Sequence, residues 1–592
     1  MKIYVRIIAA LCLCVMCTGL FAACSGGGSD PADTTPSGTS GTQPSDPTPL
    51  ETTAPDDGKV HIIESGKVKY DLIYPILADD ATKETVKRLT EAFREATGLR
   101  LRSFDDYVEA GQTRDSETYE ILLGQTGYDE SAQVFAGLRY NDYRITVVGH
   151  KIVVAAYRAE TMNAAVDWLL EAMKSGLSGS GESAALTLDS LEHSVTSEEY
   201  AVSKFTIAGN ELSLYRMVYS DAFMLDTLQT LRDELAEKTG YVLDIVKDSE
   251  PAGDYEIIFG DTNRAESAKV GAQDYLHYRL ESVGSKLVLR AGGLHSLAKT
   301  AASLVTDLIG EASEVEVPSG YLLEGNYIDD PYNNTTMADG ADVRVMSCNI
   351  LAEYENYNGR IPVAFRKEVF FAALDYYQPT VIGIQEFSPA WYACFSEYHD
   401  ADKYDIFKVM SPNGKDYYFT TILYRKDLLD VVDSGTHKYS VGNNIRGRAL
   451  AWATFRVKAT GKVFSFTSTH LDGFDSESTD VQIAEWAEIV HKLDKLGPVM
   501  STGDFNTTEG TQDYADMQSA NGMRDLRYDC EVRLNEEGSY HDLGNPMSGY
   551  GLALDHIFAT NDAICKRFEM LIFNEQIWGS DHSWVLADVK LG

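Results

Sequence analysis

Six segments after residue 340 share one pattern, in which an apolar run ends in one or two polar residues. Runs of this length that are rich in Val, Ile, Phe and Thr predict buried strands. Strand ends gathered at one edge of a sheet are where α/β folds place their chemistry. We therefore expect the polar ends of these segments to lie together. The segments cover residues 343–349, 381–386, 464–470, 498–506, 552–558 and 579–587.

The fourth of these segments combines a predicted strand with a tight Gly turn. At a period of two, Asp504 and Asn506 share one side of the strand, whereas Phe505 points into the core. A carboxylate and an amide placed in this way can hold a small polar object such as a water. An ordinary strand-end turn has the same composition, so this segment alone leaves both interpretations open.

The first half of the chain contains an internal repeat. Residues 119–132 return as residues 255–268, with a shared Tyr-x-Ile-x-x-Gly-x-Thr frame. A predicted helix that ends at Thr-Gly precedes each copy, and a predicted hairpin and a last helix follow it. We therefore predict two α+β domains, residues 60–195 and 200–327. The predicted helices are 85–98, 163–174, 227–240 and 296–309, and the hairpins are 142–154 and 277–289.

The repeated frame and its element order resemble the accessory α+β domain at the N-terminus of some glycoside hydrolases, which carries no catalysis. Glu130 and Ser131, like Glu266 and Ser267, follow the strand and the turn. They fit helix N-caps better than a ligand site. We interpret the repeats as spacers or adhesion modules, and contact with cell wall or polysaccharide stays open. Residues 328–341, rich in Asp, Asn, Pro and Thr, predict a linker.

The N-terminus has the pattern of an export signal. Two positive charges in residues 1–6 precede an apolar run over 7–23, which is too short for an ordinary spanning helix. Residues 20–24 resemble a bacterial lipobox, which predicts a lipoprotein signal peptide over 1–24 with lipidation of Cys24. Signal cleavage elsewhere would leave Cys24 unmodified. Residues 25–58, rich in Ser, Thr, Pro and Gly, predict a disordered tether. We therefore expect a lipid-anchored protein on the extracytoplasmic face of the cell membrane.

Length and cysteine content limit the class of protein. A chain of 592 residues with 44% hydrophobic residues is long enough for about three or four packed domains. Four of the eight cysteines belong to the predicted signal and anchor. The others lack metal-type spacing and are no disulfide framework for so large a domain. These residues are Cys348, Cys394, Cys530 and Cys565. They form either one disulfide bridge or four buried free thiols, and the sequence leaves both alternatives open.

The net charge is −39, and the acidic excess is spread along the chain. A protein that binds long nucleic acid through many phosphates is expected to carry a basic stripe, and the sequence contains none. A local positive site, especially one with a bound divalent cation, can override this field. The charge therefore disfavours duplex nucleic acid as a substrate without excluding phosphate esters.

Together and in order, the six segments resemble the endonuclease/exonuclease/phosphatase superfamily of metal-dependent phosphoesterases, which includes deoxyribonucleases and sphingomyelinases. The resemblance covers residues 342–592. It implies a four-layer α/β sandwich with two mixed β-sheets, here preceded by the two α+β repeats. It also implies hydrolysis of a phosphoester with Mg²⁺ or Mn²⁺ as cofactor.

The resemblance assigns metal-site roles to three residues. Glu386 and Asn349 match the family's metal-binding glutamate and the asparagine beside that metal, and Asp581 is expected close to it. Magnesium takes hard oxygen ligands and often binds only one or two carboxylates, with water completing its shell. As alternatives, Glu386 caps the following helix and Asn349 only finishes a strand.

The resemblance also implies a catalytic pair. His582 matches the family's histidine near the C-terminus, and Asp555 matches the aspartate that supports it. A carboxylate bonded to one ring nitrogen fixes the tautomer and raises the basicity of the other nitrogen. Asp504 and Asn506 would orient the attacking water. Whether Asp504 or His582 is the general base stays open.

His470 and Arg448 match residues that contact the scissile phosphate, although the neighbouring Arg446 leaves the second assignment open. His541 falls where relatives carry a loop lining the substrate cleft. For His541 and His556, a packed or surface histidine is the simpler interpretation.

We therefore expect a monomeric, surface-anchored hydrolase of a phosphodiester or phosphomonoester. The acidic balance favours a small molecule or a lipid head group as substrate, and a secreted nuclease is the alternative. A second alternative is a non-catalytic surface protein that binds through its tandem repeats. The intact set of acids and histidines argues against it.

Overall fold

The computed structural model describes residues 58–592. The exceptions are 110–111, 198, 329, 354–361, 408–418, 443–447, 474, 520–521, 536, 545–550 and 572–576. The predicted signal peptide, Cys24, residues 25–57 of the predicted tether and Arg446 therefore lie outside the described residues. In the part of the chain that is described, no helix is long and apolar enough to cross a membrane.

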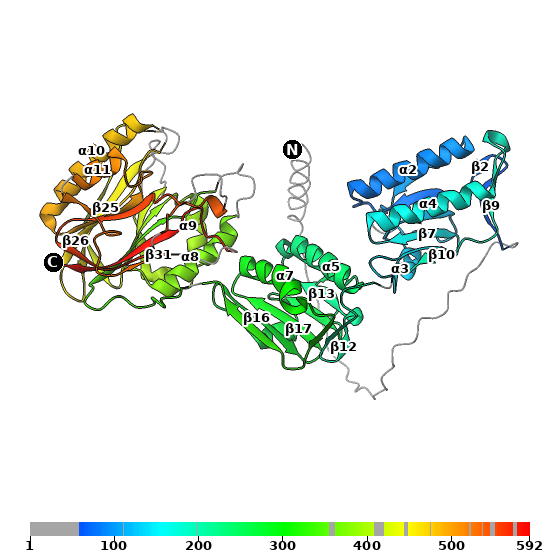
Figure 1. Cartoon of the computed structure of the whole chain (residues 1–592), viewed down its shortest axis with the longest axis horizontal. Helices are drawn as coiled ribbons and strands as arrows, with labels where there is room; N and C mark the ends of the chain where they lie inside the picture. The colour runs from blue at the N-terminus through cyan, green and yellow to red at the C-terminus, as the bar shows by residue number, and fades with distance from the viewer. Residues whose placement is uncertain are drawn as a thin grey trace, which may run out of the picture. The chain divides into compact units, whose positions relative to one another are not determined.

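The first predicted repeat contains a four-stranded sheet, β2-β1-β9-β8, and a six-stranded sheet, β10-β6-β7-β5-β3-β4. Helices α2 and α4 pack on one face of the larger sheet and α3 packs on the other (Figure 1). The elements are β1 (Val60–Glu64), β2 (Lys67–Val68), β3 (Asp71–Tyr74), α2 (Asp80–Thr97), β4 (Ser103–Asp105), β5 (Glu120–Leu123), α3 (Asp129–Phe135), β6 (Tyr143–Val148), β7 (Lys151–Ala156), α4 (Ala159–Gly176), β8 (Leu177–Ser178), β9 (Ala185–Leu188) and β10 (His193–Val195).

The second predicted repeat contains a three-stranded sheet, β12-β11-β18, and a six-stranded sheet, β14-β13-β15-β17-β16-β19. Its larger sheet has the strand order of the first repeat. The elements are β11 (Lys204–Ile207), β12 (Asn210–Glu211), β13 (Arg216–Tyr219), α5 (Leu225–Thr239), β14 (Ile245–Lys247), β15 (Glu256–Phe259), α6 (Ala265–Val270), β16 (His277–Val283), β17 (Lys286–Ala291), α7 (Leu294–Ile309), β18 (Glu314–Val317) and β19 (Leu322–Asn326).

The two segments agree in element type along most of their length. Helices α2 and α5 both end at a glycine with positive φ, Gly98 at 73° and Gly240 at 81°, because a left-handed cap suits a residue without Cβ. The smaller sheets differ. Strand β9 runs antiparallel to β1, whereas β18 runs parallel to β11. The sequence did not predict this difference, and a common evolutionary fold for the two segments stays a prediction.

The expected N-cap role of Glu130–Ser131 and Glu266–Ser267 is wrong. The caps are Tyr128 and Arg264, and neither makes a side-chain capping bond. The serines lie inside the first turn and are buried. Ser131 Oγ lies 2.7 Å from Thr126 Oγ1, and Ser267 Oγ lies 2.7 Å from Thr262 Oγ1. These hydroxyl pairs hold the strand-to-helix turn of each repeat, which explains the shared Gly-x-Thr frame.

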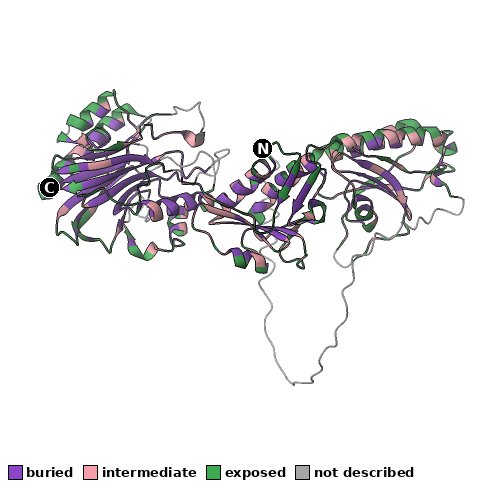
Figure 2. Cartoon of the chain, turned by 60° about the horizontal axis from the view of Figure 1, so that its bottom comes forward, coloured by how far each residue is buried: buried purple, intermediate pink, exposed green. Residues whose placement is uncertain are grey.

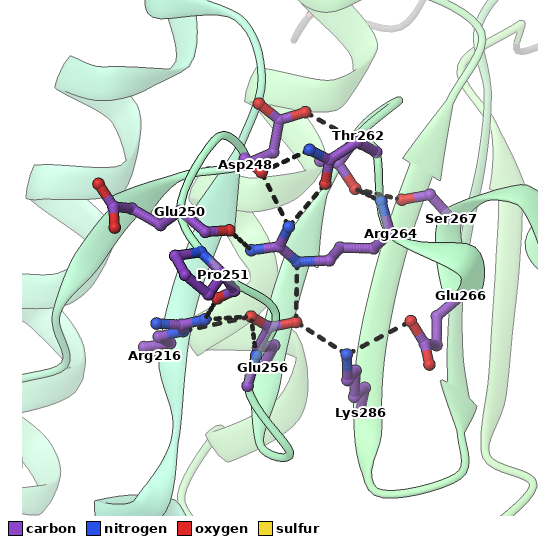
Figure 3. A network of polar contacts seen from close by, with 12 residues as sticks. Arg216, Asp248, Glu250, Pro251, Glu256, Thr262, Arg264, Glu266, Ser267 and Lys286 are labelled. Atoms are coloured by element: carbon purple, nitrogen blue, oxygen red, sulfur yellow. Dashed lines mark hydrogen bonds and ion pairs between the residues drawn. The ribbon is translucent and has the colours of Figure 1, made fainter. Parts of the chain in front are cut away.

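The second repeat also contains a buried ion cluster around Glu256 (Figure 3). Glu256 is fully buried, and its two carboxylate oxygens lie 2.7 Å from Arg216 Nη2 and 2.9 Å from Lys286 Nζ. Arg264 Nε lies 3.1 Å away. In the first repeat, the matched Glu120 contacts Lys151 Nζ at 2.8 Å and the Tyr128 hydroxyl at 3.2 Å. The cluster joins β13, β15 and β17, so its role is internal to the repeat.

The C-terminal region consists of two mixed sheets packed face to face. One has the order β22-β23-β21-β20-β32-β31-β29 and the other β24-β25-β26-β27-β30-β28. The elements are β20 (Val343–Asn349), α8 (Val363–Tyr377), β21 (Val381–Gln385), α9 (Pro389–Phe395), β22 (Tyr404–Ile406), β23 (Thr420–Arg425), β24 (Leu429–Lys438), β25 (Ala449–Val457), β26 (Val463–His470), α10 (Ser476–Leu493), β27 (Val499–Asp504), α11 (Gln512–Ser519), β28 (Arg524–Asp525), β29 (Arg533–Leu534), β30 (Asp555–Ala559), β31 (Ala563–Leu571) and β32 (Trp584–Leu591).

Apolar side chains from both sheets fill the space between them, and Val345, Phe466 and Val585 are fully buried there. Outside the sheets, α8 and α9 cover one and α10 and α11 cover the other. Figure 2 shows buried strands flanked by helices with exposed outer faces. The predicted four-layer α/β sandwich is therefore confirmed. Asn334 of the predicted linker is 2% exposed, and its carbonyl accepts a bond from Arg344 at 3.1 Å, so this residue packs on the domain.

Candidate active site

Strand register brings the predicted polar residues to one edge of the sandwich. In the first sheet, β20 and β21 run parallel and pair Asn349 with Gln385, the residue before Glu386. In the second sheet, β26 and β27 run parallel and pair His470 with Asp504, which in turn pairs with Asp555 on the antiparallel β30. Because the two sheets pack face to face, these strand ends meet across the sandwich.

Asp504 lies at the centre of this group and is 2% exposed. Its Oδ2 atom accepts a hydrogen bond from Asn349 Nδ2 at 2.9 Å. The same oxygen lies 3.2 Å from His470 Nε2 and 3.8 Å from His582 Nε2. Burial alone would raise the pKa of Asp504, but the charges of His470 and then His582 outweigh it and lower the pKa below its ordinary value. The carboxylate is therefore ionised at neutral pH.

His582 and Asp555 form a close pair. His582 Nδ1 lies 2.7 Å from Asp555 Oδ2, and both side chains are buried. Burial would lower the pKa of His582, but Asp555 and then Asp504 reverse this effect and raise it to about 10. The imidazole is therefore protonated at neutral pH in this arrangement. The predicted pair is present, and its ring carries a proton that Nε2 can donate.

Asn506 reaches Asp504 by a route that the sequence did not predict. Strand β27 ends at Asp504, and Asn506 has a φ of 50°, so the two-residue strand period does not relate these side chains. Instead, the Asn506 backbone N–H donates to Asp504 Oδ1 at 3.0 Å, and its Nδ2 donates to the Leu471 carbonyl at 2.9 Å. Phe505 is fully buried, as predicted. The turn after β27 thus fixes the orientation of the Asp504 carboxylate through its Oδ1 atom.

Glu386 and Asn349 provide oxygen atoms at adjacent strand ends. Glu386 has a φ of 62°, an uncommon conformation for a residue with Cβ, and its Oε2 accepts the Ala352 N–H at 2.8 Å. Ser388, not Glu386, caps the helix α9. Asn349 Oδ1 accepts the Leu351 N–H at 3.0 Å. Both side chains therefore contribute hard oxygen atoms to this edge of the sandwich.

Within the described ranges, no three His, Cys, Asp or Glu side chains are grouped closely enough to hold an ion. The donor set nevertheless fits a magnesium-like cation, because one carboxylate and one amide oxygen with water are a common ligand set for it. Asp581 is also buried, and its carbonyl accepts the N–H of His541 at 3.0 Å. Its part in metal binding stays a prediction.

Arg448 lies immediately before β25 and is 4% exposed. Its carbonyl accepts the Tyr439 N–H at 3.3 Å. His470 Nδ1 is buried and has no hydrogen-bond partner among the described residues, and its ring is stacked on Phe419 with centroids 6.0 Å apart. A buried nitrogen without a partner suits a polar group of a ligand. The roles of Arg448 and His470 toward phosphate stay predictions.

Asp525 and Tyr514 support the site, and sequence reasoning missed both. His556 is fully buried, with Nδ1 2.8 Å from Asp525 Oδ2 and Nε2 3.1 Å from the Thr507 carbonyl. The Tyr514 hydroxyl donates to Asp525 at 3.0 Å. This chain of contacts holds the turn after Asp504. The packed interpretation of His556 agrees with these contacts, and no local pattern around Asp525 signals its partner.

His541 is also packed rather than free to titrate near neutral pH. Burial, and then the charge of His582, lower the pKa of His541 to about 4. Its ring lies against Trp578 with centroids 4.2 Å apart. Tyr540, the preceding residue, places its ring 5.0 Å from that of His582. The segment around His541 therefore borders the site, as the resemblance implied for this region.

Comparisons with known proteins find similarity in the C-terminal region only. No curated protein matches the chain. A solved endonuclease/exonuclease/phosphatase from Bacteroides vulgatus is 25% identical, covers 42% of this chain and 99% of its own, and has a TM-score of 0.38. A Bacteroides thetaiotaomicron mannosyl-6-phosphatase is 24% identical over 42% of this chain and 99% of its own, with a TM-score of 0.37. Residues 346–582 match the model of the Endonuclease/Exonuclease/phosphatase family. The C-terminal region of the chain is thus similar to the endonuclease/exonuclease/phosphatase family.

Proposed function

We propose that this protein is an extracytoplasmic phosphoester hydrolase that uses Mg²⁺ or Mn²⁺. The observation that supports it most is the convergence of Asn349, His470 and His582 on one carboxylate, that of Asp504. These residues come from strand ends far apart in the sequence. Acidic and histidine side chains that converge from distant strand ends at one edge of a sheet, with shifted pKa values, favour a catalytic site.

The side chains divide the work of hydrolysis. A cation held by Glu386 and Asn349 would neutralise phosphate charge when bound. The ionised Asp504 is placed to accept a proton from an attacking water, and the N–H of Asn506 holds its other oxygen. His582, protonated and held by Asp555, is placed to donate its Nε2 proton toward the departing oxygen. His470 Nδ1 and Arg448 would contact the phosphate.

The substrate we propose is a small or lipid-linked phosphodiester or phosphomonoester. The net charge of −39 opposes the approach of a long polyanion, so a nuclease is the second candidate.

We further propose that Cys24 carries the lipid anchor, that the chain is a monomer, and that the repeats act as spacers or contact cell-wall polysaccharide. In cell fractionation, Cys24→Ala should move the protein out of the membrane. Firm membrane retention of that variant would refute the anchor.

The decisive experiment measures hydrolysis of bis(p-nitrophenyl) phosphate and p-nitrophenyl phosphate with and without EDTA. We expect EDTA to abolish the activity and added Mg²⁺ or Mn²⁺ to restore it. Asp504→Asn should lose this activity, and Asp562→Asn, which changes an exposed aspartate of the same domain, is its matched control. Full activity in EDTA would refute the proposed dependence on a divalent cation. If the wild type hydrolyses neither these esters nor nucleotides nor phospholipids, the proposal that the protein is a phosphoester hydrolase is refuted.

A further inference from the structure

Cys530 and Cys565 lie opposite each other on neighbouring backbone segments. They form an isolated parallel bridge, and the Glu531 N–H donates to the Cys565 carbonyl at 3.0 Å. Neighbouring strands lie about 4.8 Å apart. This spacing falls within the Cα separation of about 4.4–6.8 Å that a disulfide spans. The Cys530 Sγ atom itself lies 3.1 Å from the Val532 carbonyl oxygen, on the backbone segment that continues toward β29.

The residues that follow the two cysteines hold this register. Lys566 and Glu531 form an ion pair with 2.5 Å between Nζ and Oε1. The Phe568 N–H donates to the Val532 carbonyl at 2.8 Å, at the start of the short pairing between β29 and β31. Contacts between the residues that follow the two cysteines thus keep the two backbone segments aligned. The backbone register therefore places the two cysteines side by side.

We propose that Cys530 and Cys565 form a disulfide bond when the exported protein meets a disulfide oxidant. Cys530 is partly exposed and Cys565 is 2% exposed, so the Cys530 thiolate attacks first. It forms a mixed disulfide and releases one thiol of the oxidant. The Cys565 thiolate then attacks the Cys530 sulfur and releases the second thiol. Two cysteine thiols and one disulfide thus become one protein disulfide and two thiols.

The order of attack agrees with the contacts of Cys530. The hydrogen bond from Cys565 lowers the pKa of the Cys530 thiol and favours its thiolate. Oxidising conditions are those of exported proteins, in which disulfides persist. The other cysteine that is not fully buried, Cys394, is the natural reference for a thiol that stays free.

The bond would tie one end of a segment whose other end supports the active site. Ser539 Oγ accepts the N–H groups of Leu554 and Asp555 at 3.0 Å each, and Tyr540 bridges His582. Among the described residues between these ends, only the two-residue strand β29 pairs with the sheet edge. A covalent link at Cys530 would therefore limit the opening of this segment from β31. The inference does not rest on the hydrolase activity.

Peptide mapping of the full chain tests the bond directly. The protein is isolated without reductant, blocked with iodoacetamide and digested with trypsin. Cleavage after Arg527, Arg533 and Lys566 releases the two cysteines on separate peptides, 528–533 and 534–566. We expect these peptides as one species two hydrogens lighter than their sum, and Cys394 alkylated. Alkylation of both Cys530 and Cys565, in the isolated protein and after refolding with oxidised glutathione, would overturn the proposal.

Reductant-dependent unfolding tests the consequence. Reduction should lower the unfolding temperature of the C-terminal domain by about 10 °C, because the bond closes a long loop of the unfolded chain. In the double variant Cys530→Ala with Cys565→Ala, reductant should have no effect, and Cys394→Ala should behave like the wild type. An unchanged unfolding temperature of the mapped, disulfide-bonded protein on reduction would overturn the stabilising role.

Discussion

Two buried networks in this chain are each centred on a carboxylate, and they differ in how completely their polar atoms are hydrogen-bonded. The carboxylate of Glu256 in the second repeat accepts bonds from the N–H of Gly253 and from Lys286, Arg216 and Arg264. The network around Asp504 contains two buried atoms without a hydrogen-bond partner among the described residues, Asp555 Oδ1 and His470 Nδ1. A saturated network stabilises a fold, whereas buried atoms left open mark a place where a ligand completes the contacts.

The pKa shifts in the two networks differ in the same way, structural around Glu256 and reciprocal between an acid and a base around Asp504. Burial opposes ionisation of Glu256, but the bonds from Gly253, Lys286, Arg216 and Arg264 outweigh it and lower its pKa to about 2. All of these partners belong to the second repeat. At the site, a carboxylate and an imidazole shift each other in opposite directions, which leaves a proton acceptor and a proton donor side by side. Mutations should therefore separate stability from rate.

The largest effect should come from Glu256→Ala. It leaves three cationic side chains around a buried void, and breaking such a buried pair costs about 3–5 kcal/mol. We expect the second repeat to lose that much stability in denaturant unfolding, with faster amide exchange in β15 and β17, while hydrolysis per folded molecule is unchanged. Glu120→Ala in the first repeat is the matched control, because Glu120 is 15% exposed and has fewer ionic partners. Equal losses in the two variants would contradict the comparison.

Acid should remove the same stabilisation without a mutation. The pKa of Glu256 is about 2 in the folded state and 4.5 ordinarily, so its ionised form stabilises the fold fully above about pH 4.5. This stabilisation, about 3 kcal/mol for the whole shift, is lost as the pH falls through 4.5 toward 2. Unfolding of the second repeat, followed between pH 6 and 2, should show this slope, and Glu256→Gln should flatten it. The same slope in Glu256→Gln would assign it to other carboxylates.

Substitutions in the candidate active site should change the rate of hydrolysis rather than the stability of the fold. Asp504→Ala and His582→Ala should each lower kcat by about 10²-fold or more, the scale of lost acid-base catalysis. Glu386→Gln should weaken the dependence on Mg²⁺, seen as a higher cation concentration for half activity. Steady-state kinetics across a cation titration measures both, with Asp562→Asn as control. Wild-type rates in Asp504→Ala would remove this carboxylate from the mechanism.

Sequence periodicity predicted the parts of this molecule that local chemistry determines. The apolar runs predict the strand ends at Asn349 and His470, because burial between two sheets demands continuous hydrophobic residues. The helix ends at Gly98 and Gly240 were likewise predicted, because a left-handed cap favours glycine. The family resemblance then supplied the roles that periodicity alone cannot give.

Features that depend on contacts between distant residues could not be predicted. Asp525 and His556 are 31 residues apart, and nothing in either neighbourhood signals their contact. Strand β9, antiparallel to β1, also pairs with the edge strand β8, and the three-stranded sheet of the second repeat has no counterpart of β8. The positive φ of Asn506 ended a strand pattern that was predicted to continue. These errors concern turns and tertiary pairs, where local propensity has little influence.

The smallest effect should come from Asp555→Asn, which tests whether Asp555 acts through His582. The carboxylate lies 2.7 Å from His582 Nδ1, and its loss removes the charge that keeps the imidazole protonated. We expect a fall in kcat of about tenfold, smaller than in His582→Ala. Because Asp555 works only through the ring, the double variant should be little slower than His582→Ala alone. A double-mutant cycle in kcat measures this coupling. Full additivity would show that Asp555 acts on the substrate independently of His582.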